Sequence, residues 1–180
     1  MTMQTNPNDI NLYFQHSFIH YLKRMIAILE KFHSAYGDEF EDLLQKRLAK
    51  DMFPMGQQFS IAASFSMRAC CWLRGVELVK FEQGPWTFTT LMRELTQTLT
   101  YINNVDAMDF TGWEEKSISL TIGQEASQLT GRDLVDIYAL PNFFFHISMG
   151  YAILRQQGVP IGKGDFDGLH VYAPAFRFSV

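Results

Sequence analysis

The sequence predicts an all-α protein, a four-helix up-down bundle with a small β-hairpin insertion between the third and fourth helices. Four long segments carry apolar residues at the three- and four-residue steps of a buried helix face. One stretch, residues 117–122, instead alternates apolar and polar residues as a strand does. At 180 residues the chain has the length of one domain, so we expect a single unit over 1–180.

The first two long helices are predicted in the N-terminal part of the chain. The first is expected over residues 8–35, where one face carries Phe14, Phe18, Tyr21, Leu22, Met25, Leu29 and Phe32. A short charged helical connector is expected over 38–49. The second long helix is expected to open near Asp51 with Pro54 in its first turn, where a missing N–H costs nothing, and to end at Gly75.

The third long helix and the hairpin come next. Thr87 is expected to cap the third helix, whose apolar face continues to Ile102. Beyond it, Ile118 and Leu120 alternate with polar residues, and Gly123 stands where a hairpin would turn. These signals predict two short antiparallel strands between the third and fourth helices.

The last long helix is expected over residues 131 to about 157. Thr130 and Asp133 resemble a capping box at its start, and Pro141 should kink it because proline cannot donate to the preceding turn. The C-terminal tail, residues 169–180, is apolar and aromatic. We expect this tail to pack on the bundle or on a partner.

Charge and composition exclude several classes of protein. The formal net charge is −4, and no basic run is long enough to follow a phosphate backbone, so we expect no nucleic-acid partner. The N-terminal sequence lacks the pattern of a signal peptide, and no segment approaches the roughly 20 apolar residues that span a bilayer. We therefore expect a cytoplasmic protein without membrane association.

The two cysteines, Cys70 and Cys71, are adjacent. They are interpreted as reduced helix residues, with a redox-active thiol as the alternative.

A helical wheel at about 100° per residue places three polar residues on apolar faces. On the last helix one sector holds Val135, Tyr138, Asn142, His146, Met149 and Ile153. On the second helix Gln58 lies near the middle, and Gln57 at the edge, of the stripe formed by Ile61, Ala62, Phe65, Ala69, Trp72 and Val76. We expect Gln58, Asn142 and His146 to satisfy one another or nearby backbone groups, or else to line a small polar pocket. The predicted pocket comprises Gln58, Phe65, Tyr138, Asn142, His146 and Met149.

The first helix carries a second pair of polar residues at an informative spacing. His16 and His20 are four residues apart, which is a spacing that two metal ligands on one helix can have. Both point away from the apolar stripe of this helix, so we expect them to be solvated or at a subunit contact. Metal binding by this pair is the alternative.

The residues of the second and last helices also carry a family resemblance. The set "DMFP" with Gln58, then "TGRD", "LPNFFFH" and "YAILRQQGVPIGKGDF" resembles an uncharacterised branch, a domain of unknown function, of the DinB/YfiT-like superfamily. The match runs from about residue 12 to Phe166 and is most specific over its last part. The resemblance implies a DinB-like four-helix bundle, commonly a homodimer, in a superfamily described as metalloenzymes or metal-dependent thiol transferases.

The resemblance also implies a metal site, which this sequence alters. Better-known members place one histidine early in the second long helix and an HxxxH pair on the fourth. Gln58 and Asn142 stand where two of these ligands would be, and only His146 matches. Two amides and one imidazole bind zinc or nickel far more weakly than three imidazoles, so we expect no tightly bound metal, with a divalent ion as the alternative.

Two functions follow from this altered triad. The first is a DinB-like bundle whose degenerate metal-site pocket binds a small molecule or a partner. The alternative is a metal-dependent or His146-dependent thiol S-transferase in which Gln58 and Asn142 orient the substrate. The aromatic excess and the apolar last helix separately predict a homodimer.

Overall fold

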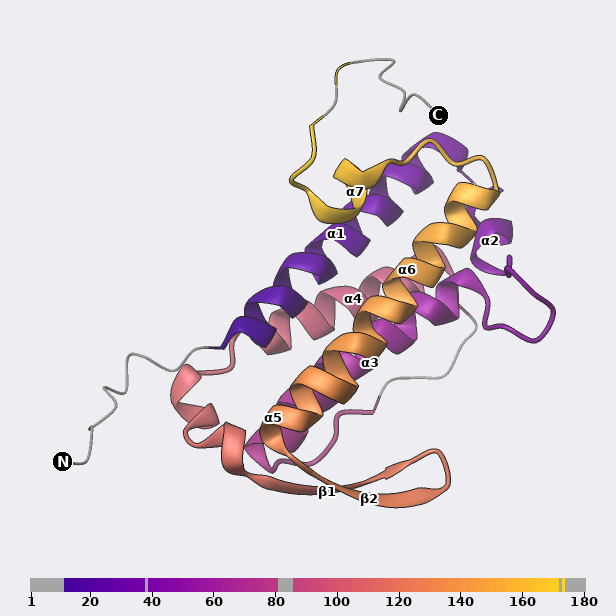
Figure 1. Cartoon of the computed structure of the whole chain (residues 1–180). Helices are drawn as coiled ribbons and strands as arrows, with labels where there is room; N and C mark the ends of the chain where they lie inside the picture. Colours follow the sequence, from indigo (N-terminus) through magenta and orange to yellow (C-terminus); the bar gives the residue numbers. More distant parts are fainter. Residues whose placement is uncertain (1–11, 38, 81–85, 172, 174–180) are drawn as a thin grey trace.

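Four long helices form the bundle in the computed structural model, which describes residues 12–37, 39–80, 86–171 and 173 (Figure 1). They are α1 (Tyr13–Tyr36), α3 (Met55–Arg74), α4 (Phe88–Asn103) and α6 (Leu140–Gln156). Helix α3 packs against both α6 and α4, and α1 packs against α4. The predicted helical bundle with a hairpin insertion is confirmed.

Shorter elements connect and extend these helices. Helix α2 follows α1, two 3₁₀ turns follow α4, and α5 with a π turn leads directly into α6. Their bounds are Glu39–Leu44 for α2, Ala107–Phe110 and Trp113–Glu115 for the 3₁₀ turns, Gly131–Asp133 for α5, Leu134–Ala139 for the π turn and Lys163–Asp167 for α7. The strands are β1 (Ser117–Ile122) and β2 (Glu125–Thr130).

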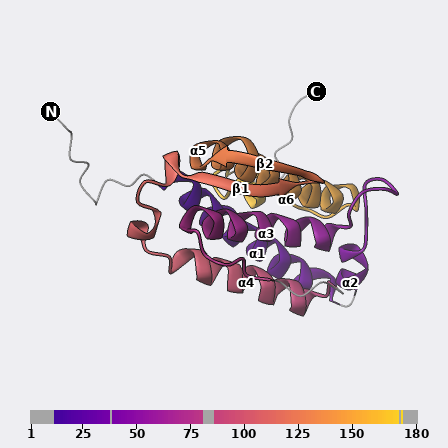
Figure 2. The ribbon, with the colours of Figure 1, turned by 90° about the horizontal axis from the view of Figure 1, so that it is seen from below.

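Helices α3 and α4 run in the same direction, as Figures 1 and 2 show. At one end of the bundle, the Glu41 carboxylate of α2 accepts a hydrogen bond from the Phe88 N–H at the start of α4. At the other end, the Arg74 guanidinium on α3 donates to Tyr101 near the end of α4. The directions of the four long helices are therefore up, down, down and up, which differs from the alternating order of the expected up-down bundle because α3 and α4 are parallel.

The end of α3 and the start of α4 agree with the residues expected to mark them, whereas the start of α3 does not. Gly75 ends α3 with a left-handed φ of 70°, as expected. Thr87 and Thr90 form the capping box of α4, so that cap is confirmed as well. Pro54, however, is the N-cap residue of α3 and does not lie in its first turn. Asp51 lies outside the helix because the chain still turns through residues 48–52.

The hairpin extends from the end of the bundle where α3 ends and α5 begins (Figure 1). Ile122 pairs with Glu125, so the turn contains two residues, and Gly123 adopts the positive φ of 62° that such a turn requires. Ile118 and Leu120 are buried while the residues between them are exposed. The predicted alternation of apolar and polar residues in β1 is therefore confirmed, and its apolar side faces the core.

The last helix runs from Gly131 to Gln156 with an irregularity before Pro141. The Thr130 hydroxyl accepts a hydrogen bond from the Asp133 N–H, so the predicted cap is present. The π turn Leu134–Ala139 directly precedes Pro141, which cannot donate to the carbonyl groups of the preceding turn. A widened turn, rather than a break in the helix, accommodates the proline.

This last helix also differs from the sequence expectation about apolar length. By length and composition alone, Gly131–Gln156 could cross a bilayer, although the sequence analysis expected no such segment. Part of it is buried against α3, where a Cβ added to Gly150 would lie 2.4 Å from Phe59 Cε1. Its apolar character fits a helix that packs in the core of the bundle.

Helix α7 packs against α1 at the C-terminal end of the described chain. The Arg24 guanidinium donates to the Asp165 carbonyl oxygen, and Lys31 forms an ion pair of 2.7 Å with the Asp165 carboxylate. Leu169 and Val171 are exposed, but most of the tail 169–180 lies outside the described residues. The expected packing of the tail stays a prediction.

Candidate functional site

Gln58 and His146 meet between α3 and α6. The His146 Nδ1 lies 2.7 Å from Gln58 Oε1, and both side chains are buried, with exposed fractions of 8% and 1%. Gln58 is in the first turn of α3, and His146 is in the middle of α6. The structure thus brings together two of the three polar residues that the wheel placed on core-facing sides.

The second hydrogen bond of Gln58 determines which imidazole nitrogen carries the proton. The Gln58 Nε2 donates to the carbonyl oxygen of Phe53, at 3.2 Å, just before α3 begins. Gln58 Oε1 therefore faces the imidazole as an acceptor, and His146 Nδ1–H donates to it. In the neutral imidazole, Nε2 is left with a free lone pair, and no hydrogen bond to it is found among the described residues.

Aromatic side chains surround this imidazole. Phe65 on α3 stacks on His146 with ring centroids 5.8 Å apart, and Phe145 meets it edge-on at 5.2 Å. Burial in these surroundings lowers the pKa of His146 to about 4, because desolvation disfavours the charged form. His146 is therefore a neutral hydrogen-bond acceptor near pH 7 and a weak base.

Asn142 does not join the pair. Its Nδ2 donates to the Tyr138 carbonyl oxygen of its own helix, at 2.7 Å, where the π turn before Pro141 leaves carbonyl groups in need of donors. Tyr138, Asn142 and Met149 are only partly buried. The side of α6 that faces the core is instead centred on Phe143, Ile147, Gly150 and Leu154.

The π turn explains this difference from the wheel for Tyr138, whereas Asn142 and Met149 lie in the regular helix α6, beside its most buried residues. A wheel at a constant angle per residue assumes an unbroken α-helix, whereas a π turn contains more residues per turn and shifts the phase. Tyr138 lies inside the π turn, so its position relative to His146 is misjudged. The predicted pocket lining therefore divides into buried Gln58, Phe65 and His146 and half-exposed Tyr138, Asn142 and Met149.

The second helix shows a related difference. Ala62, Phe65 and Ala69 are buried as expected, but Val76 is 41% exposed because α3 ends at Arg74. Gln57 is partly buried on a different side of α3 from Gln58. The backbone carbonyl of Phe53 also orients Gln58, a contribution that the sequence does not reveal because no side-chain pattern marks a carbonyl group.

The donor set does not fit a resident metal ion. Gln58 Oε1 accepts the hydrogen bond from His146 Nδ1–H, and the Asn142 amide is held by its own helix, which leaves one imidazole nitrogen as a strong ligand. Among the described residues, no group of three His, Cys, Asp or Glu side chains could hold an ion. Where the resemblance implied a metal-binding triad, the structure has a hydrogen-bonded pair, Gln58 and His146.

The other candidate residues lie elsewhere. His16 is exposed, whereas His20 is half-buried and its Nε2 lies 2.7 Å from the Asp167 carbonyl oxygen, so it contacts the C-terminal segment.

The two cysteines, Cys70 and Cys71, are free and buried in α3, and desolvation raises the pKa of Cys70. A raised thiol pKa disfavours the thiolate that a redox or nucleophilic cysteine needs.

Comparison with known proteins places this fold and this pair in a family. Residues 13–167 match the profile of a domain of unknown function, DUF1993. The chain belongs to the DUF1993 family. A crystal structure of a DinB family member protein from Shewanella denitrificans is similar to this DUF1993 chain, with a TM-score of 0.78, 31% sequence identity and coverage of 91% of this chain and 98% of that one. A search among curated proteins finds no match.

The DinB-like classification that the sequence resemblance implied is therefore confirmed for the DUF1993 chain. The family match includes α1 through α7, and hence both Gln58 and His146. It assigns no activity, so the chemistry of the pair has to be argued from its geometry.

Proposed function

We propose that this DUF1993 protein is a binding protein rather than a metalloenzyme, and that His146 Nε2 accepts a hydrogen bond from a small aromatic ligand. One observation carries the proposal: the Gln58–His146 hydrogen bond orients a neutral imidazole whose Nε2 lone pair is unused by the described residues. Phe65 stacks on the imidazole and Phe145 meets it edge-on, so both supply aromatic surface beside this acceptor. A donor such as a phenol hydroxyl matches both features.

The test uses phenol as the probe and nitrogen NMR as the readout. Long-range ¹⁵N–¹H spectra of untagged protein should show His146 protonated at Nδ1, and phenol should shift the Nε2 resonance at millimolar concentration. His146→Gln should abolish phenol binding, whereas His16→Gln, at an exposed histidine, should leave it unchanged. Tight, stoichiometric zinc or nickel in untagged protein, lost in His146→Ala, would overturn the proposal.

A second candidate function is a thiol S-transferase without a resident metal. It is favoured by the same lone pair, because His146 Nε2 could accept the proton of a thiol that attacks an electrophile. A pKa of about 4 makes His146 a weak base for a thiol whose own pKa is about 8.5, which is why binding is preferred. Turnover of low-molecular-weight thiols with electrophiles that is lost in His146→Gln would favour the enzyme.

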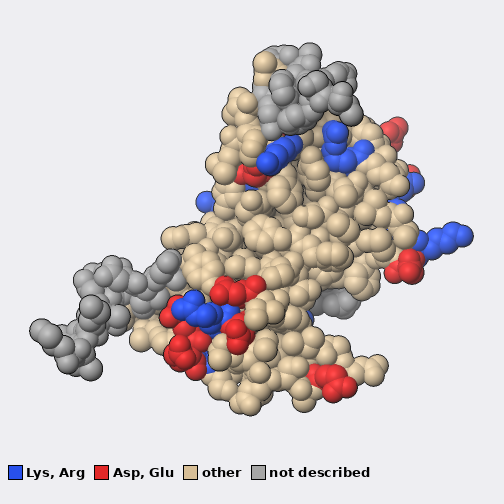
Figure 3. Space-filling model, in the orientation of Figure 1, with Lys and Arg blue, Asp and Glu red and all other residues tan. Residues whose placement is uncertain are grey.

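We further propose a homodimer that buries the outer side of α6. No Asp, Glu, Lys or Arg occurs between residues 137 and 154, and Figure 3 shows an uncharged surface along the middle of this helix. Ile137 and Phe145 are 69% and 52% exposed there. Large exposed apolar side chains grouped on one helix are typical of an interface. A location in the cytoplasm stays a prediction.

Light scattering at micromolar concentration tests the dimer. The wild-type protein should show twice the chain mass of 20.8 kDa, and Phe145→Glu should show the monomer mass. Met108→Glu is the matched control, because Met108 is 51% exposed but lies in the 3₁₀ turn Ala107–Phe110, outside α6. A monomeric wild-type protein would contradict the proposal.

A further inference from the structure

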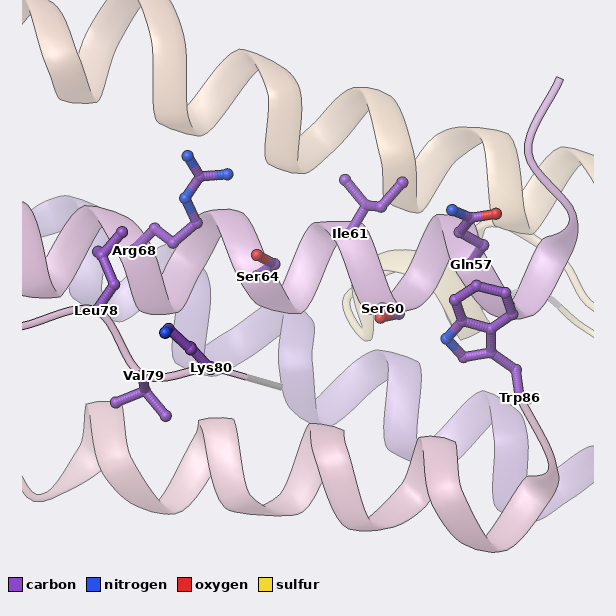
Figure 4. A pocket seen from close by; sticks show the side chains of 9 residues that line it. All are labelled: Gln57, Ser60, Ile61, Ser64, Arg68, Leu78, Val79, Lys80 and Trp86. Carbon is purple, nitrogen blue, oxygen red and sulfur yellow. The ribbon is translucent and has the colours of Figure 1, made fainter. Parts of the chain in front are cut away.

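A cavity of about 450 Å³ borders a different side of α3 from the Gln58–His146 pair (Figure 4). Its walls come from α3, from residues 78–80 and from Trp86. The lining residues are Gln57, Ser60, Ile61, Ser64, Arg68, Leu78, Val79, Lys80 and Trp86. A cavity of this size is in the usual range for small-molecule sites, roughly 300–1,000 Å³.

The cavity is elongated along α3. Gln57 and Trp86 lie at one end, whereas Arg68, Leu78 and Lys80 lie at the other, as Figure 4 shows. Eleven helical residues separate Gln57 from Arg68, which corresponds to about 16 Å along the helix axis. Trp86 lies close over Gly56, where an added Cβ would be 2.8 Å from the Trp86 Cβ, and its carbonyl oxygen accepts a hydrogen bond from Gln45. A ligand that fills this space would therefore be extended.

Both ends of the cavity carry unused hydrogen-bond donors. Arg68 Nε and Trp86 Nε1 are buried, and neither has a hydrogen-bond partner among the described residues. Figure 4 shows the Trp86 ring nitrogen on the edge turned toward Ser60. Buried donors without partners are rare in folded proteins, and a molecule bound in the cavity can supply an acceptor to each of these two.

The charges at the cavity are of one sign. Arg68 and Lys80 are cationic, no Asp or Glu is among the lining residues, and neither cation forms an ion pair within the described part of the chain. The guanidinium of Arg68 lies over the Trp72 ring at 4.5 Å, a contact that orients it. Glu94 is the nearby acid: burial raises its pKa, and the Ser60 hydroxyl donates to its carboxylate in opposition to that effect.

We propose that this cavity binds an extended small organic anion. Its carboxylate or phosphate group accepts the unpaired Arg68 Nε–H and is attracted by the charge of the exposed Lys80, and its apolar body lies along Ile61 and Val79. A polar acceptor at the far end of the ligand receives the Trp86 Nε1–H. The lining of the cavity includes neither Gln58 nor His146, but Arg68 lies 6.0 Å from the centre of the Phe65 ring that stacks on His146, so variants at His146 are needed to separate the two sites.

Competition against the fluorescent probe 8-anilino-1-naphthalenesulfonate, an aromatic anion, tests this site. Octanoate and octyl phosphate should displace the probe, and the stronger of the two identifies the preferred head group. Octylammonium should not displace it, and acetate or inorganic phosphate alone should compete at least tenfold more weakly. Displacement by octylammonium as strong as by octanoate would overturn the proposal.

Variants then locate the binding. Arg68→Gln should weaken octanoate binding about tenfold and Lys80→Gln about threefold, with circular dichroism confirming that both fold. Arg132→Gln is the matched control, because Arg132 pairs with Glu114 at an exposed site. His146→Gln and Phe145→Glu should leave octanoate affinity unchanged, which separates this site from the one proposed above. Unchanged affinity in both Arg68→Gln and Lys80→Gln would overturn the assignment.

Discussion

The buried polar groups on two sides of helix α3 differ in whether they have hydrogen-bond partners. Toward α6, the Gln58 amide and the His146 imidazole satisfy each other and the Phe53 carbonyl, within an apolar interface. Toward residues 78–80 and Trp86, Arg68 Nε and Trp86 Nε1 are buried beside a cavity and have no partners in the described chain. We call these the closed side and the open side of α3.

The difference separates polar groups that stabilise the fold from polar groups that are available to bind a ligand, although both kinds lie on one helix. A polar pair whose hydrogen bonds are mostly internal stabilises the fold and offers little to a ligand beyond the one remaining lone pair. Buried donors without partners contribute nothing to the fold by hydrogen bonding and gain an acceptor only when something binds. The closed side should therefore be sensitive to substitution in stability measurements, and the open side in binding measurements.

The largest effect is expected at the helix contact of the closed side. Gly150→Val places a side chain where the Phe59 ring lies 2.4 Å from the position of a Cβ, so α3 and α6 must separate. We expect a loss of about 3 kcal/mol in unfolding free energy, as for an overpacked core, measured by urea denaturation.

Gly162→Ala is the control for this substitution, because nothing lies within 4 Å of its Cβ position and its φ is not positive. Combining Gly150→Ala with Phe59→Leu should recover part of the loss seen for Gly150→Ala alone. Equal stability of the Gly150→Val and wild-type proteins would show that the closed side is not tightly packed.

The polar pair should give the next largest effect. Gln58→Leu or His146→Leu alone leaves the other group buried without its partner, at about 2 kcal/mol each. The double variant should cost less than the sum, with a coupling of roughly 1 kcal/mol in a double-mutant cycle. Gln57→Leu, on the open side, is the matched control and should change stability little. Strict additivity would mean that the pair does not act as a unit.

The titration of His146 should make stability depend on pH. Its folded pKa of about 4 lies below the unfolded value of 6.5, so the unfolded chain binds the proton more tightly. The stability is fully present above pH 6.5 and is lost as the pH falls from 6.5 toward 4. We expect a loss of about 1–2 kcal/mol, since His146 is partly reachable by solvent.

Urea denaturation at several pH values, with His146→Gln as the reference, isolates this contribution from carboxylates that titrate nearby. The difference between the two proteins should be constant above pH 7 and should shrink as the pH falls. A constant difference down to pH 4 would show that His146 titrates normally.

The smallest stability effect is expected on the open side. Trp86→Phe keeps an aromatic ring over Gly56 and removes a donor that has no partner in the described chain. The unfolding free energy should change by about 0.5 kcal/mol or less, measured by thermal or urea unfolding. A loss well above this would mean that the Trp86 Nε1–H has a structural partner, which would erase the contrast between the two sides.

Local signals predicted most of the fold because they depend on a few neighbouring residues. Three residues have the roles that their types favour: Thr87 caps α4, Gly75 ends α3, and Gly123 forms the hairpin turn. Asp51 misled the prediction for the start of α3 because it resembles an N-cap residue, yet the chain turns once more before Pro54. The shared direction of α3 and α4 depends on the path of a connection, which periodicity does not reveal.

The site was less predictable, for two physical reasons. Gln58 and His146 could be paired because each lies on the inner side of an unbroken α-helix, but the phase of Tyr138 required knowledge of the π turn. The open side draws its walls from α3, from residues 78–80 and from Trp86, segments that meet only in the folded chain. No spacing in the sequence marks such a cavity.

The π turn between Leu134 and Ala139 has a consequence for how this helix tolerates insertions and deletions. Deleting one residue within it restores a regular α-helix and leaves the hairpin end in nearly the same orientation relative to the His146 end, because each residue of the widened turn advances the helix by a smaller angle. A deletion farther along α6 would instead turn Gly150 away from Phe59. Among homologues, length changes in this helix should therefore be confined to the six residues of the π turn.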